Sequence, residues 1–244
     1  MKIGKDIDIL FENDDCLILN KPAGLAVQGG KGVRVSLDSL LAESFRERPL
    51  LVHRLDRDTS GVILAAKRRE AAARFSLWFS LGKTGPVRGA GGRDPPGPCA
   101  GKGGPEKIYL AVSAGLPQPP SGTITQSLEI RGKTRPSATF YRVLSPAPED
   151  PSEEPDYSFL ELELGTGRMH QIRRHLSRLG NPVLGDDKYG NFTLNKKYRR
   201  ERGLKRLLLH AFRLIIPKEN IDVRAPLPPH FDPYLDRAPL SFHD

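Results

Sequence analysis

The chain has 244 residues, of which 38% are hydrophobic, and it carries a formal net charge of +9. This length is enough for one large or two small domains with a sizeable core. Two cysteines, Cys16 and Cys99, do not make a disulfide framework, and no apolar run is long enough to cross a bilayer. The excess of Lys and Arg suits a polyanionic partner such as a nucleic acid. Because the first residues contain no apolar leader, we expect a reducing, cytoplasmic compartment.

The N-terminal part is predicted to contain two strands and a helix. Short apolar runs at 7–11 and 16–20 are expected to be strands joined by an acidic turn. The apolar spacing at 36–48 predicts a helix with Ser36 as its N-cap. Between the second strand and this helix, Lys21 begins a loop with the sequence Lys-Pro-Ala-Gly. Two interpretations of Lys21 stay open, a solvated loop lysine and a structural role near an active site.

Residues 53–61 form the polar stretch His-Arg-Leu-Asp-Arg-Asp-Thr-Ser-Gly, and the apolar run 62–66 follows it. This pattern predicts a loop that leads into a core strand, a junction that often carries reactive groups. Asp56 is therefore a candidate catalytic carboxylate. The alternative is a turn in which Asp and Thr side chains cap local backbone groups. His53 is expected to organise the loop rather than to act as an acid or base.

A second helix is predicted over 69–81, with aromatic residues that we assign to the core. The segment 82–105 then breaks the pattern, because nine of its 24 residues are Gly and five are Pro. Such a composition cannot bury enough surface to offset its ordering entropy, so we predict a disordered insert. It carries four Lys or Arg against one Asp, and the remaining chain keeps +6 of the +9. A true insertion and a local error in the gene model both stay open.

The second half of the chain is predicted to be rich in strands. These are expected at 107–112, at several places within 120–142, at 159–164 and at 207–216, with a Pro/Glu/Asp loop at 145–156. A helix is predicted over 168–179, with an apolar stripe of Met169, Ile172, Leu176 and Leu179. Within 196–206, seven basic residues against one acidic residue predict an RNA-facing loop. His170 and His175 are five apart and no cysteine has a ligand spacing, so no metal site is expected.

Three motifs resemble signatures of the RluA-type pseudouridine synthases. They are Asn-Lys-Pro-Ala-Gly-Leu at 20–25, His-Arg-Leu-Asp-x-x-Thr-Ser-Gly at 53–61, and Thr-Gly-Arg-x-His-Gln-Ile-Arg-x-His at 166–175. The resemblance implies that Asp56 is the catalytic aspartate and that Arg173 is its cationic partner. The S4 RNA-binding module of some members is expected to be missing, because the motifs begin almost at Met1.

The resemblance also implies three residues that contact the substrate. Tyr109, in a Lys-x-Tyr motif, would stack on the target uracil, and Ile172 would pack beside it. Arg54 would enter the base stack vacated by the flipped nucleotide, a task that suits its planar cation. The turn Gly-Asp-x-x-Tyr-Gly at 185–190 is expected to be structural. Gln28 stands near a position where the family often has a histidine, and we assign it no chemistry.

Pseudouridine formation breaks the C1′–N1 bond of uridine, rotates the uracil and joins C5 to C1′. It involves no redox change, so we expect neither a cofactor nor a metal. A carboxylate can serve as nucleophile or as base in this chemistry, and the sequence leaves both open for Asp56. Because burial alone would raise the pKa of such a carboxyl, an ionised aspartate needs a cationic partner.

The resemblance implies an α+β fold with a bent, mixed, mainly antiparallel sheet, flanking helices and a central active-site cleft. We expect a single catalytic domain over 1–244, a monomer without membrane association. Its expected activity is isomerisation of specific uridines in structured RNA, with 23S ribosomal RNA preferred over transfer RNA. One rival is a non-catalytic RNA-binding ribosome-assembly protein of the same fold. A second is a hydrolase with Asp56 as nucleophile, which would lack a recognisable paired acid.

Overall fold

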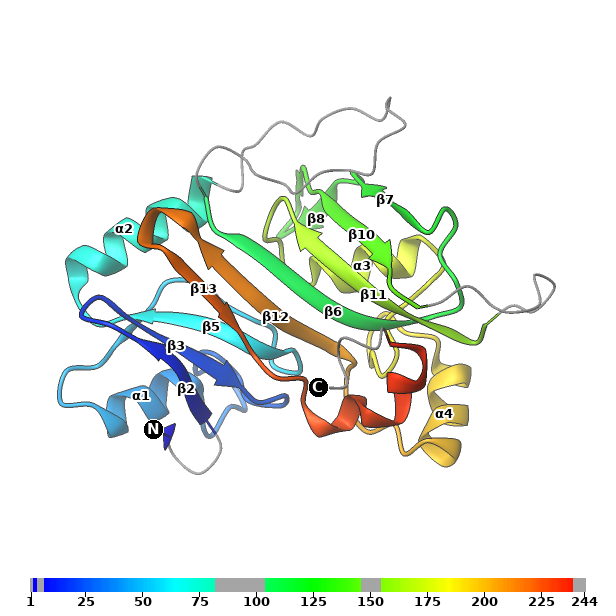
Figure 1. Cartoon of the computed structure of the whole chain (residues 1–244), viewed down its shortest axis with the longest axis horizontal. Coiled ribbons are helices and arrows are strands. Elements are labelled where there is room, and N and C mark those ends of the chain that lie inside the picture. Colours follow the sequence, from blue (N-terminus) through cyan, green and yellow to red (C-terminus); the bar gives the residue numbers. More distant parts are fainter. Residues whose placement is uncertain (1, 4–6, 82–103, 146–154, 239–244) are drawn as a thin grey trace. The chain divides into compact units, whose positions relative to one another are not determined.

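The computed structural model describes residues 2–3, 7–81, 104–145 and 155–238 (Figure 1). They group into two compact units. The first comprises the described residues before 82 together with 104–107 and 210–227. The second comprises 108–145, 155–209 and 228–238. The predicted insert and most of the predicted acidic loop, 82–103 and 146–154, lie outside the described residues. The single domain over 1–244 stays a prediction.

The first unit is built on a mixed sheet. Its strand order is β1 (Lys2–Ile3), β2 (Ile7–Glu12), β3 (Cys16–Lys21), β5 (Ser60–Ala66) and β12 (Leu209–Ile216). Two more strands lie outside this order, since β4 (Leu50–Leu51) pairs with β5 and β13 (Ile221–Arg224) pairs with β12. Strands β5 and β12 are parallel and the other pairs are antiparallel. All seven residues of β5 are buried, as expected of a strand with neighbours on both sides.

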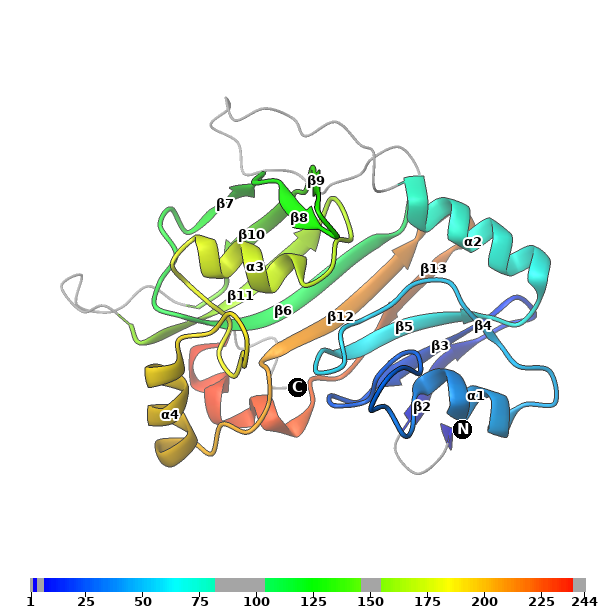
Figure 2. The ribbon, with the colours of Figure 1, turned by 180° about the vertical axis from the view of Figure 1, so that it is seen from behind.

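Two helices accompany this sheet, α1 (Leu37–Ser44) and α2 (Arg69–Leu81), and a short 3-10 helix, η1 (Pro217–Glu219), joins β12 to β13. Helix α2 lies against β4 and β5 (Figure 2) and inserts Phe75 and Phe79 into the core. Ser36 caps α1 as predicted, because its Oγ accepts a hydrogen bond from the backbone N–H of Ser39. The helix ends at Ser44, four residues before the predicted boundary, because Phe45 is extended.

The second unit contains a fully antiparallel sheet. Its order is β6 (Glu106–Ala114), β11 (Tyr157–Leu164), β10 (Thr139–Val143) and β7 (Ser121–Ile124). A separate hairpin consists of β8 (Leu128–Ile130) and β9 (Lys133–Arg135). Helix α3 (Gln171–Arg178) lies against β10 (Figure 2), and α4 (Phe192–Glu201) and the 3-10 helix η2 (Pro229–Arg237) complete the unit. None of the helices in the described residues is long and apolar enough to span a membrane.

The aromatic residues of the second unit form a buried cluster. The rings of Tyr157, Tyr198 and Tyr234 meet edge to face, with centroids 5.5–6.0 Å apart. They come from β11, α4 and η2, so this cluster fastens both C-terminal helices to the sheet. A mixed, mainly antiparallel α+β architecture with flanking helices is thereby confirmed.

Candidate active site

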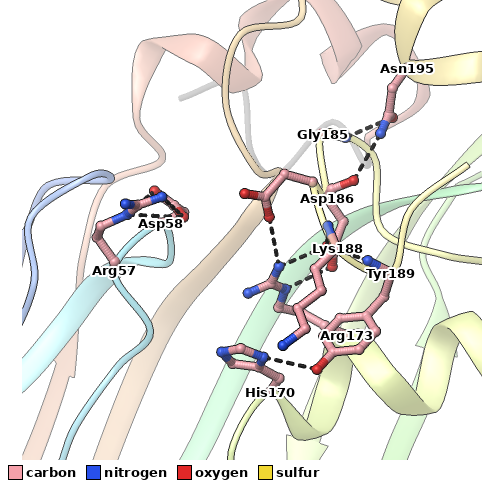
Figure 3. A network of polar contacts seen from close by, with 10 residues as sticks. Arg57, Asp58, His170, Arg173, Gly185, Asp186, Lys188, Tyr189 and Asn195 are labelled. Carbon is pink, nitrogen blue, oxygen red and sulfur yellow. Dashed lines mark hydrogen bonds and ion pairs between the residues drawn. The ribbon is translucent and has the colours of Figure 1, made fainter. Parts of the chain in front are cut away.

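The loop that carries Asp56 is fixed on both sides by buried residues. Leu55 is 4% exposed and Thr59 is 2% exposed, whereas Asp56 between them is only partly buried. The backbone carbonyl of Asp56 accepts a hydrogen bond from the N–H of Thr59 at 3.2 Å, which closes the turn. On the exposed side, Arg57 and Asp58 pair with each other (Figure 3). The predicted loop leading into a core strand is therefore present.

The motif ends in a glycine, Gly61, because a side chain would not fit at this position. Its φ is +107°, in the region that favours glycine, and a Cβ there would lie 2.2 Å from the backbone oxygen of Ala211. Only glycine permits the parallel bridge between β5 and β12 at this point. Ser60, one residue earlier, holds buried His210 through a hydroxyl–imidazole contact of 2.8 Å.

Lys21 is fully buried, which removes the interpretation of a solvated loop lysine. Its Nζ donates to the carbonyl oxygens of Pro22, Leu25 and Arg57 at 2.8–3.0 Å, so each ammonium hydrogen has an acceptor. Burial lowers the pKa of Lys21 to about 7, against the opposing effect of the Asp58 and Asp56 carboxylates. Because the carbonyl of Arg57 directly follows Asp56, Lys21 ties the 21–25 loop to the Asp56 loop.

His53 organises the same loop from its other end. Its Nε2 accepts the backbone N–H of Leu64 at 2.9 Å, and its ring stacks on Phe79 at 4.3 Å. Burial, and then the nearby Lys107 cation, lower the pKa of His53 to about 3. The imidazole is therefore neutral, with its proton on Nδ1, and holds β5 in place as predicted.

In the second unit, Arg173 forms a buried ion pair with Asp186. Its Nε and Nη2 donate to the two carboxylate oxygens at 2.7 Å each, and Nη2 also donates to Asp187 at 3.1 Å (Figure 3). Arg173 is 4% exposed and Asp186 is 0% exposed. Burial raises the pKa of Asp186, but the hydrogen bonds from Arg173 and from the N–H groups of Tyr189 and Lys188 outweigh it and lower that pKa.

Tyr189 completes the surroundings of Arg173. The guanidinium carbon lies 5.3 Å from the centre of the Tyr189 ring, within cation–π distance. The Tyr189 hydroxyl contacts Nδ1 of His170 at 3.1 Å (Figure 3). The turn at 185–190 therefore orients Arg173 through charge, hydrogen bonds and an aromatic face. The prediction that this turn is structural is confirmed.

The third motif is held by a buried amide. Gln171 accepts from Thr166 and from the N–H of Arg168, and it donates to the Ala138 carbonyl and to Thr139. The two hydrogen bonds that Gln171 accepts close the segment on itself, and the two that it donates bind the segment to β10 and the residue before it. His175 is also buried and contacts Ser137, Thr139 and the carbonyl of Gln126. Both histidines of the motif thus have protein partners.

The predicted start of helix 168–179 was wrong. His170 has a φ of +53°, a left-handed conformation that cannot continue a right-handed helix, so α3 begins at Gln171. Met169 consequently lies outside the helix and is 51% exposed rather than part of the apolar stripe. Ile172 and Leu176 are buried as expected.

The loop predicted over the basic residues 196–202 was also wrong, since most of them lie on α4. Asn191 caps this helix by accepting the N–H of Leu194, and Tyr198 anchors it in the aromatic cluster. Lys and Arg are good helix formers, so a basic run is compatible with a helix once it has an apolar face.

The other predicted substrate contacts fall in both units. Arg54 is exposed, in the first unit. Tyr109 on β6 is 8% exposed and Ile172 on α3 is 4% exposed, both in the second unit. Asp56 belongs to the first unit and Arg173 to the second, so their pairing stays a prediction.

Sequence reasoning missed two residues of this region. It did not find Asp186 as the carboxylate of Arg173, and it did not place Lys21 on the carbonyl of Arg57. A signal existed for Asp186, because the Gly-Asp-x-x-Tyr-Gly turn follows closely after the arginine motif. No local pattern indicated the acceptor of Lys21, which lies 36 residues away.

The motifs at 53–61 and 166–175 can now be compared with known proteins. The sequence pattern of the family described as RNA pseudouridylate synthase matches residues 15–178. The chain belongs to this family. The RluA-type resemblance and the predicted pseudouridine synthase activity are thereby confirmed.

Individual relatives agree with this membership. A ribosomal large subunit pseudouridine synthase C of Vibrio cholerae is 31% identical, over 94% of this chain and 68% of its own length. A tRNA pseudouridine synthase C of Haemophilus ducreyi is 32% identical, over 84% of this chain and 83% of its own length. The solved structure of human RNA pseudouridylate synthase domain containing 1 is 27% identical and has a TM-score of 0.67, covering 97% of this chain and 89% of that one. The predicted fold class is confirmed by these likenesses.

Proposed function

We propose that this enzyme converts specific uridines of large-subunit ribosomal RNA to pseudouridine, with Asp56 as the catalytic residue. The observation that carries the role of Asp56 is the construction of its loop. Lys21, Leu55 and Thr59 fix the backbone around Asp56 from buried positions, while its own side chain keeps some exposure. A reactive group on a preorganised loop is what covalent or acid–base chemistry needs.

Arg173 is proposed as the cationic partner of Asp56, as the family motif implies. Support comes from the way Asp186 holds the guanidinium. Its three contacts to Asp186 and Asp187 use Nε and Nη2, so they fix the plane of the guanidinium fork. In this proposal Asp186 sets the orientation of Arg173, and Arg173 keeps Asp56 ionised at neutral pH.

Tyr109, Ile172 and Arg54 are proposed to contact RNA. Tyr109 and Ile172 would form the apolar walls around the flipped uracil, and the exposed Arg54 would replace that base in the stack. The reaction exchanges the C5 hydrogen of uracil for the bond to C1′ and returns a hydrogen to N1, so release of tritium from [5-³H]uridine RNA reports it directly.

The test of Asp56 is Asp56→Asn, assayed by tritium release from ribosomal RNA lacking the modification. We expect turnover below about 1% of wild type, with RNA affinity unchanged or slightly increased, because one negative charge leaves a polyanion site. Turnover above that level on the true substrate would exclude Asp56 as the catalytic residue.

Transfer RNA is the second candidate substrate, favoured by the similarity to the Haemophilus ducreyi enzyme. Mapping pseudouridines in ribosomal and transfer RNA from cells with and without this gene separates the two. A site that disappears only from large-subunit ribosomal RNA supports the proposal, and one that disappears only from transfer RNA contradicts it. We also propose that the enzyme is cytoplasmic and monomeric, and light scattering tests the latter.

A further inference from the structure

A surface hollow in the second unit is lined by cations and by an exposed aromatic ring. Its volume is about 390 Å³, and its lining includes Lys196, Arg199 and Lys205 together with Phe192 and Leu204. Phe192 is 62% exposed, so its ring is accessible to a ligand. The volume lies within the range of cavities that hold small ligands.

The three cations of the hollow differ from Lys197 and Arg202, which lie nearby and are paired with carboxylates. On α4, Lys197 pairs with Asp156 at 2.8 Å, and Arg202 just after it pairs with Asp236 at 3.3 Å. Lys196, Arg199 and Lys205 form no ion pair within the part of the chain that the structure describes. The face of α4 toward the hollow therefore keeps its positive charge, whereas Lys197 and Arg202 are neutralised by carboxylates.

Helical spacing places the key residues together. Phe192, Lys196 and Arg199 follow each other at intervals of four and three, so they share one face of α4. Such cations bind phosphates, and a ring beside them offers a stacking surface for a base. Asp187 also lines the hollow, but its carboxylate forms an ion pair with Arg173 and accepts a hydrogen bond from it at 3.1 Å.

The floor of the hollow belongs to the turn that orients Arg173. Gly185 and Asp186 line it, and Asn195 of α4 joins both, accepting the N–H of Gly185 at 2.9 Å and donating to the carbonyl of Asp186 at 3.0 Å (Figure 3). A ligand in the hollow would thus be fixed relative to the proposed catalytic arginine.

We propose that this hollow binds an unpaired nucleotide of the substrate RNA outside the target uridine, with its base on Phe192 and its flanking phosphates on Lys196, Arg199 and Lys205. The proposal rests on the proposed RNA substrate and adds a second contact point, which would help the enzyme to select a structured site. Base stacking tolerates any sequence, so the hollow reads single-strandedness rather than base identity.

The test compares variants for binding to a fluorescent oligouridylate of about 12 nucleotides and to a duplex RNA of the same length. The triple variant Lys196→Ala, Arg199→Ala, Lys205→Ala is expected to bind the single strand at least about tenfold more weakly. Its slope of log affinity against log salt should fall by about 2, since each lost phosphate contact on a single strand removes about 0.7. Phe192→Ala should weaken single-strand binding by about fivefold or more and leave duplex binding unchanged.

Lys197→Ala is the matched control, because it removes the same charge from the neighbouring residue on the neutralised face. We expect its affinity to stay within about twofold of wild type. Circular dichroism melting of every variant checks that α4 remains folded. A loss of affinity for Lys197→Ala equal to that of the triple variant, or wild-type single-strand binding by Phe192→Ala, would overturn the proposal.

Parallel tritium-release assays keep this inference separate from the proposed function. If wild-type enzyme is active and the triple variant keeps its KM, affinity and salt slope, only the hollow is wrong. If Asp56→Asn remains active while the triple variant loses affinity and KM rises, the catalytic assignment fails and the hollow stands. An increase in KM at unchanged kcat for the triple variant is the expected result, because its residues bind RNA away from the reacting bond.

Discussion

Arg173 and Asp186 form a buried pair in which each charge is satisfied by several hydrogen bonds. Removing one partner leaves the other charge in a medium of low polarity, which costs more than the pair contributes while intact. The stability of the second unit should therefore fall strongly when either partner of the pair is replaced.

Arg173→Met should therefore lower the free energy of unfolding by about 3–5 kcal/mol and remove most activity. Arg174→Met is the control on the neighbouring position. Arg174 is only partly buried and donates to the carbonyl of Glu129, so its loss should cost about 1 kcal/mol. Denaturant titration and tritium release measure both variants. Equal effects of the two substitutions would show that the Asp186 contact is not the source of the difference.

His53 provides a prediction of pH dependence. Its pKa falls from 6.5 to about 3 on folding, so between these values the unfolded chain binds more protons than the folded one. The contribution of this group to stability is present above pH 6.5 and is lost as the pH falls toward 3.

Gln keeps a hydrogen-bond acceptor but does not titrate. His53→Gln should therefore reduce the slope of the unfolding free energy against pH in this window, by an amount that corresponds to at most about one bound proton. Denaturant titrations at several pH values compare the two proteins. An unchanged slope in His53→Gln would mean that the imidazole titrates normally in the folded state.

The element that most directly supports Asp56 is the loop after β3, where Lys21 joins three carbonyl groups. The N–H of Gly24 reaches the same carbonyl of Arg57 at 2.9 Å, so two donors converge on the residue after Asp56. A hydrophobic side chain at position 21 would fill the space but would leave the carbonyls of Pro22 and Leu25 without this donor.

Lys21→Met should thus destabilise the first unit by about 1–3 kcal/mol and lower kcat, because the Asp56 loop loses its anchor. Lys31→Met, at an exposed position, should change neither by a measurable amount. Melting temperature and tritium release are the readouts. Full activity of Lys21→Met would show that the loop keeps its geometry without the lysine.

For the whole molecule, the net charge of +9 favours RNA binding, and the number of phosphates that its cations contact sets how affinity responds to salt. The segment 84–103 contributes part of this charge and has no core-forming pattern. Its deletion should leave melting temperature and turnover close to wild type, because shortening a long loop changes the closure cost by only about 0.6 kcal/mol per factor of two in length. Its Gly and Pro content also predicts that proteases cut there first.

The rival view is that this segment binds RNA. Measuring the affinity of the full chain and of the deletion variant for ribosomal RNA at about 50 and 200 mM salt tests it. In that case the deletion would weaken binding and reduce the salt slope, because fewer counterions would be released. A large loss of affinity together with a reduced slope would establish the segment as functional and would count against an error in the gene model.

The residue patterns were enough to predict most strands and helices and the family. The periodic runs at 7–11, 69–81 and 107–112 lie on strands and helices of the structure, because side-chain periodicity acts over a few residues. The motif around Asp56 indicated the chemistry, because a residue pattern of that length is specific even without coordinates.

Which groups meet across the chain became clear only from the folded structure. Lys21 is buried because the carbonyl of Arg57 comes to it from a distant loop, and Arg173 finds Asp186 in a turn that follows its helix. The helix expected from residue 168 begins only at Gln171, because His170 has a left-handed backbone and its ring contacts Tyr189. These contacts depend on which distant segments of the chain pack together, and neither periodicity nor helix propensity contains that information.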